Sequence, residues 1–165
     1  MAPTNLAEWL QFAVDFFLAF AADFLAFIVI AAAVAAFAFY FGRNRVVPLA
    51  TSLYAAIPLY LVFPFTSYIT TPFLHIALYL VLAFLAFVAF SGLSSFVASA
   101  SFGLVQLVVL SAAIAGMLIA VSIHILPVED IYTFSIATKA LFDSPEAFFF
   151  WLLAPLAAIY IFGRG

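Results

Sequence analysis

The sequence predicts an all-α fold, a polytopic bundle of transmembrane helices. Of its 165 residues, 70% are hydrophobic and 7% are charged, whereas a soluble domain has about 45–50% apolar and about 25% charged residues. A small soluble domain has too much surface for its volume to bury so many apolar side chains. The composition therefore excludes a soluble enzyme and a disordered tail. Four basic residues are too few for a phosphate-binding patch, so we expect no nucleic-acid partner.

Apolar stretches of membrane-spanning length divide the chain into five predicted spans within a single integral membrane domain, residues 1–165. A span needs about 20 mostly apolar residues to cross the hydrocarbon core. The lipid bilayer is therefore the first expected partner. The predicted spans are residues 23–41, 46–65, 72–90, 102–126 and 147–162.

The first span ends at a basic break that runs from Gly42 to Arg45. Its helical pattern begins well before the span, because Asn5 with Glu8 three residues later is typical of a capping box. Polar side chains then recur at helical spacing on one stripe up to Asp23. We expect residues 5–22 to form an amphipathic extension that either lies in the membrane interface or continues the span beyond it.

Prolines mark the second and third spans. Pro48 falls in the first turn of the second span, where its missing N–H is harmless. Pro58 is interior and predicts a kink, and Pro64 marks the end of the span. The polar link over residues 66–72 is short, so the second and third spans should form an antiparallel hairpin.

The last third of the chain predicts a span, a surface helix and a final span. The fourth span stops before Pro127. Residues 130–142 place most of their large apolar side chains opposite Asp130 and Lys139, which favours a short helix on the membrane surface. Ser144 is then a predicted helix cap, with Pro145 at the first helical position of the final span.

The few basic residues predict the orientation of the chain. With five spans, Arg43, Arg45 and Arg164 fall on one side of the membrane, and Lys139 alone falls on the other. Cytoplasmic loops carry the excess of Lys and Arg in membrane proteins. We therefore expect a multi-pass protein of the inner or plasma membrane, with its N-terminus outside and its C-terminus in the cytoplasm.

The sequence predicts no catalytic residues, no cofactor and no metal site. The motifs of hydrolases and phosphate-binding loops are missing, and no cysteine is present. His75 and His124 are the only candidates for metal ligands, but two separate histidines are more often interhelical hydrogen-bond partners. Asp15 and Asp23 are candidates for an ion or proton path. The simpler interpretation puts both acids on the solvated face of the extension.

Rows of small residues predict where helices pack closely, because small side chains let two backbones approach each other. The simpler interpretation is packing between spans of this chain. The sharper hypothesis is association with a second copy or with another membrane protein. The rows repeat every four residues and comprise Ser91, Ser95, Ser99 and Gly103, then Ala112, Gly116 and Ala120, and in the first span Ala31/Ala35 and Ala32/Ala36.

Two segments resemble known bacterial membrane proteins. The segment SASFGLVQLVVL (residues 99–110), leading into Ile125–Pro127, resembles the colicin-V-production-protein-like family of small membrane proteins. The segment FDSPEAFFFWLLAP (residues 142–155) is similar to the ends of uncharacterised polytopic membrane proteins of small-genome bacteria. The first span departs from the family pattern, since it is rich in Ala and Phe where glycines are expected.

The resemblance implies an accessory membrane role, with no catalytic residues to carry over. We therefore expect a non-enzymatic structural or accessory protein that acts through helix–helix contacts. The alternative is a small channel or transporter subunit, for protons, ions or metals, that uses the outer acids with His75 and His124.

Overall fold

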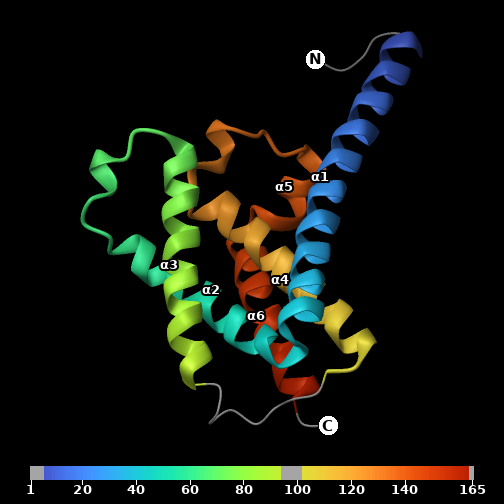
Figure 1. Cartoon of the computed structure of the whole chain (residues 1–165). Coiled ribbons are helices and arrows are strands. Elements are labelled where there is room, and N and C mark those ends of the chain that lie inside the picture. Colours follow the sequence, from blue (N-terminus) through green and yellow to red (C-terminus); the bar gives the residue numbers. More distant parts are fainter. Residues whose placement is uncertain (1–5, 94–101, 164–165) are drawn as a thin grey trace.

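The computed structural model describes residues 6–93 and 102–163, and every regular element within them is a helix (Figure 1). The predicted all-α fold class is therefore confirmed. Short 3-10 helices η1 (Arg43–Arg45), η2 (Thr66–Tyr68) and η4 (Pro127–Asp130) lie between the α-helices. The α-helices are α1 (Leu6–Phe41), α2 (Val46–Leu61), α3 (Pro72–Leu93), α4 (Leu104–His124), α5 (Ile136–Phe142) and α6 (Pro145–Phe162).

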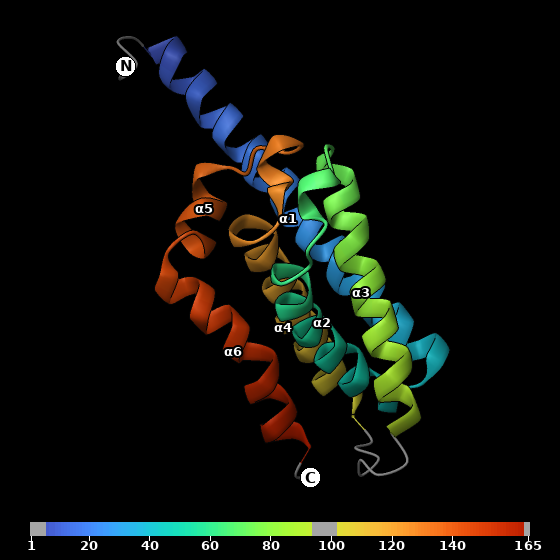
Figure 2. The same cartoon turned by 90° about the vertical axis from the view of Figure 1, so that its left-hand side faces the viewer.

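Helix α4 forms the centre of the bundle. Ten of its 21 residues are buried, against two of the 18 residues of α6. Helices α1 and α6 both pack on α4, while α2 and α3 form a hairpin beside them (Figure 2). Side chains of α2 and α4 belong to one core cluster, which includes Ala50 and Leu53 of α2 and Ile114 of α4.

Among the described residues, four helices have segments long and apolar enough to cross a membrane: Ala21–Phe41, Pro72–Gly92, Leu104–His124 and Pro145–Phe162. Large apolar side chains stay exposed on their outer faces, for example Leu25 at 61%, Phe84 at 63% and Phe150 at 65%. A soluble protein rarely exposes contiguous apolar surface of this extent. The fold is compatible with a membrane protein whose outer surface contacts lipid.

The second predicted span, residues 46–65, is too long. Helix α2 has 16 residues and ends at Leu61, three residues after its interior proline, Pro58. Beyond it the Phe63 N–H donates to the Tyr60 carbonyl at 3.2 Å, in a turn. The reason is Pro64, because a proline disfavours helical backbone at the preceding residue. Helix α2 is consequently shorter than the four helices of spanning length.

The basic break ends α1 as predicted. The helix stops at Phe41, and Gly42 has a φ of 103°, a left-handed conformation that favours glycine. The Gly42 N–H still donates to the Ala38 carbonyl at 3.1 Å. Arg43 then donates from Nη1 to the Phe102 carbonyl at 3.0 Å, which ties this turn to the start of α4.

Helix α1 is continuous over 36 residues, so the expected extension and the first span belong to one helix. Its amino-terminal half projects beyond the other helices (Figures 1 and 2). The carboxyl ends of α1 and α6 lie at the same end of the bundle (Figures 1 and 2). Asn5, the predicted cap, falls outside the described residues.

The predicted surface helix over residues 130–142 is wrong in extent. Only α5, residues 136–142, is α-helical, and η4 precedes it with irregular chain between them. Phe142 is buried whereas its neighbour Leu141 is 58% exposed, so the predicted apolar face does not form. The start of α6 is confirmed: Ser144 is its cap and accepts a hydrogen bond from the Ala147 N–H at 3.1 Å.

Candidate functional site

Asp23 lies in the interior of the protein, near the start of the spanning part of α1. Its side chain is 5% exposed. The Ser135 N–H donates to its Oδ2 at 2.8 Å, and the Tyr132 hydroxyl donates to its Oδ1. The expectation that Asp23 lies on a solvated face is therefore wrong, because donors from the segment before α5 cover its carboxylate.

The backbone of this segment explains how the donors are positioned. Ser135 caps α5 and accepts the Thr138 N–H at its Oγ, at 3.2 Å. Its own N–H stays outside the helix and is free to donate to Asp23. The Ser135 hydroxyl also donates to the Thr138 Oγ1 at 3.2 Å. We call Asp23, Tyr132, Ser135 and Thr138 the Asp23 cluster.

Tyr132 acts in this cluster as a lasting donor. The hydrogen bond to Asp23, followed by burial, raises the pKa of Tyr132 to about 12. An unperturbed tyrosine has a pKa of about 10. The hydroxyl consequently stays protonated over the whole physiological pH range and donates a hydrogen bond to Asp23. The cluster joins α1 to the segment before α5 by polar contacts.

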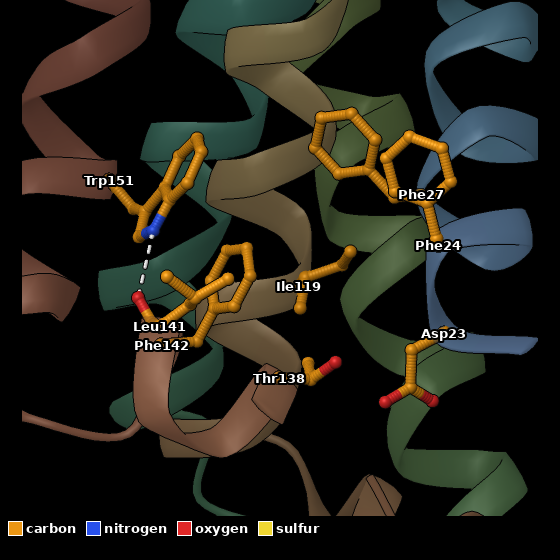
Figure 3. Close-up of a pocket in the computed structure, with 8 residues that line it drawn as sticks. All are labelled: Asp23, Phe24, Phe27, Ile119, Thr138, Leu141, Phe142 and Trp151. Atoms are coloured by element: carbon orange, nitrogen blue, oxygen red, sulfur yellow. Dashed lines mark hydrogen bonds between the residues drawn. The ribbon is translucent and has the colours of Figure 1, made fainter. Parts of the chain in front are cut away.

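A cavity of about 220 Å³ opens beside Asp23 (Figure 3). Its walls come from α1, α4, α5 and α6, and all but two of its lining side chains are apolar. The Asp23 carboxylate and Thr138 lie together at one end, and Trp151 lies at the other (Figure 3). The lining residues are Asp23, Phe24, Phe27, Ile119, Thr138, Leu141, Phe142 and Trp151.

Each of the two histidines has its own hydrogen-bond partner. His75 in α3 shares a hydrogen bond of 2.9 Å between its Nδ1 and the Tyr60 hydroxyl. His124 at the end of α4 lies 2.9 Å from the Phe142 carbonyl through its Nε2, which carries the proton because a carbonyl only accepts. Within residues 6–93 and 102–163, no group of three acidic or histidine side chains could hold a metal ion.

Gly116, in the small-residue row of α4, lies at the contact with α6. Gly116 is buried, and a Cβ added to it would lie 2.0 Å from Cζ3 of Trp151, so the indole ring rests on the bare backbone. Trp151 also stacks on Phe142 at a centroid distance of 4.8 Å and donates to the Leu141 carbonyl at 3.3 Å. Ala120 is fully buried in the same helix, and Ala112 is partly buried.

The remaining predicted residues lie elsewhere. Gly103 is the cap of α4, and its N–H donates to the Gln106 Oε1 at 2.8 Å. The Gln106 side chain therefore caps the helix to which it belongs. Ser91 lies in the last turns of α3, and Asp15 lies in α1 eight residues before Asp23. Arg43 and Arg45 form η1. Ser95, Ser99 and Arg164 fall outside the described residues.

Sequence reasoning missed the partners of Asp23 and the partner of Gly116. The hydroxyl-bearing segment Tyr132–Ser135 was visible, but nothing in the local pattern joins it to an acid more than 100 positions away. An acid at the edge of a span remains a usable signal, because such a charge demands partners.

No protein-family model matches the chain, and no curated protein or solved structure matches it.

Proposed function

We propose that the chain is a single integral membrane domain with a non-enzymatic, accessory role exerted through helix–helix contacts. The observation that carries the proposal is an uncovered row of small side chains on α1. Ala32 and Ala36 are exposed, while α1 packs on α4 through the face that holds Val34 and Ala38. Small exposed rows let a second transmembrane helix approach closely. The partner is a second copy or another membrane protein.

Substitution of Ala36 tests this role. Ala36→Leu should remove the partner from the protein purified in mild detergent from native membranes, because the added side chain keeps a second backbone away. Native gels and identification of the co-purified chain measure the effect. Ala26→Leu is the matched control, since Ala26 is also exposed on α1 but lies about 80° around the helix from Ala36. Equal partner recovery from both variants would refute the proposal for this row.

We further propose five membrane crossings, with α2 as the second. Its 16 residues span about 24 Å, which is short of a core of about 30 Å. Burial of Val46, Leu53 and Tyr60 among neighbouring helices supports a short crossing, because little of α2 then has to match the lipid. The carboxyl ends of α1 and α6 lie at the same end of the bundle, which also favours an odd number of crossings from α1 to α6 (Figure 1).

Reporter fusions test the orientation. Fusions after Asn44 and at Gly165 should both report the cytoplasm, because Arg43, Arg45 and Arg164 then lie inside. A fusion in the segment after His124 should report the opposite side. Enzymatic reporters with opposite compartment requirements measure each position twice. An external signal at either of the first two sites would contradict five crossings with an external N-terminus.

The burial of Asp23 beside an open cavity favours a second candidate function, a subunit that conducts protons or metal ions. In this alternative the outer acids, His75 and His124 deliver the ion and Asp23 carries it. Purified protein in liposomes would then support a proton or metal flux that Asp23→Asn abolishes. If liposomes that contain the native chain show no proton or metal flux, this alternative is excluded and the accessory role is favoured. The resemblance to colicin-V-production-like proteins agrees with that role and remains a proposal.

A further inference from the structure

We propose that the cavity of about 220 Å³ beside Asp23 holds a segment of an acyl chain of a membrane lipid whose headgroup has no net negative charge. The inference rests on the proposed membrane function. It assigns a ligand class to a cavity that the helix contacts leave open between α1, α4, α5 and α6. The occupant is a bilayer phospholipid, zwitterionic and bearing an amine.

The chemistry of the walls selects an apolar occupant. Phe27, Ile119 and Phe142 present hydrocarbon to the cavity. The two polar side chains at its end, Asp23 and Thr138, already take part in the hydrogen bonds of the Asp23 cluster. A buried water needs two to four polar partners, and an apolar cavity of about 150 Å³ stays dry yet admits benzene. A cavity of this size and lining therefore favours methylene groups over water.

The position of the cavity selects a lipid as the source of those groups. Two walls belong to α1 and α6, whose segments of spanning length are apolar and only 11% buried. At the rim, Phe24 is 53% exposed and Leu141 is 58% exposed, so the cavity joins the outer apolar surface. In a bilayer that surface is covered by acyl chains, which can enter the cavity without crossing water.

The charges around the rim select the headgroup. Asp143 directly follows the lining residue Phe142, and Glu146 lies in the first turn of α6. Lys139, the one basic residue of α5, forms an ion pair with Glu129 at 2.6 Å. The net charge at this end is negative, so an anionic headgroup is repelled whereas an ammonium group is attracted.

Fluorescence quenching of Trp151 by brominated acyl chains tests the inference. Trp9→Phe leaves Trp151, which lines the cavity, as the single tryptophan. Two titrations are compared. Brominated phosphatidylethanolamine is added to bilayers of unbrominated phosphatidylglycerol, and brominated phosphatidylglycerol is added to bilayers of unbrominated phosphatidylethanolamine. We expect the brominated phosphatidylethanolamine to reach half-maximal quenching at a mole fraction at least threefold lower than the brominated phosphatidylglycerol does. Equal mole fractions for the two lipids would overturn the headgroup selection.

A matched control separates the cavity from the bilayer around it. Phe150→Trp, combined with Trp9→Phe and Trp151→Phe, puts the fluorophore on the exposed face of α6, about 1.5 Å away along the axis. This control should be quenched without lipid preference. Identical curves for the control and for Trp151 would overturn the cavity site and leave the membrane proposal intact. Loss of quenching at both positions would refute membrane residence itself.

Filling the cavity gives a second, independent readout. Ile119→Phe adds volume to the α4 wall, and Leu141→Phe adds it at the exposed rim, where folding is least affected. Each variant should bring the Trp151 curve back to that of the surface control. Retention of the threefold preference in both variants would show that the lipid binds elsewhere.

Discussion

Replacement of Gly116 by alanine is expected to destabilise the protein by about 1–3 kcal/mol, the usual cost of added volume in a packed core. The new Cβ would lie 2.0 Å from Cζ3 and 2.1 Å from Cε3 of Trp151. The indole has little freedom to move, because it stacks on Phe142 and donates to the Leu141 carbonyl. Thermal unfolding of the purified protein in mild detergent measures the loss, and Gly116→Leu should show a larger one.

The chain offers a matched control at Gly92. It also lies in a helix, but an added Cβ there meets no atom within 4 Å. Gly92→Ala should leave stability unchanged or raise it by up to about 1 kcal/mol, because alanine favours helix. Trp151→Leu should lessen the cost of Gly116→Ala, since the clash is with the ring. Equal melting temperatures for the Gly92 and Gly116 variants would contradict the close contact between α4 and α6.

The Gly116 contact illustrates how far sequence reasoning reaches in a membrane protein. Spacing of small residues identified the row in α4, because a packing face repeats every three to four residues whatever its partner is. The partner itself, Trp151, depends on which helices become neighbours. In a chain that is 70% hydrophobic, nearly every face of every helix is apolar, so the sequence alone does not distinguish packed faces from lipid-facing ones.

Helix ends were predicted well where special residues mark them. Gly42 ends α1, and Ser144 with Pro145 starts α6, because backbone conformation and capping are local properties. The segment before α5 was predicted badly for the opposite reason. Its apolar spacing suggested a helix from Asp130, but the distant carboxylate of Asp23 holds Tyr132 and Ser135 in irregular chain. A tertiary contact overrides local periodicity at this point.

Asp23→Ala should cost about 1.5–3 kcal/mol, the range for hydrogen bonds to a charged group. The substitution leaves the Ser135 N–H without its acceptor and removes the partner of the Tyr132 hydroxyl. The segment before α5 should then detach from α1 first, because these hydrogen bonds join it to α1. Hydrogen exchange of residues 131–138, followed by mass spectrometry in detergent, should rise in the variant while exchange in α4 stays unchanged. Faster exchange throughout the chain would contradict a local role.

Asp23→Asn is the informative companion, because its side chain can satisfy both partners. The Asn Oδ1 can accept the Ser135 N–H, and its Nδ2 can donate to the Tyr132 oxygen, since a hydroxyl also accepts. We expect stability and exchange close to those of the native chain, with the negative charge removed. A proton or metal flux lost in this stable variant would assign Asp23 to ion transport. If Asp23→Asn keeps the native properties while Asp23→Ala is destabilised, the role of the carboxylate is to hold α1 against the segment before α5.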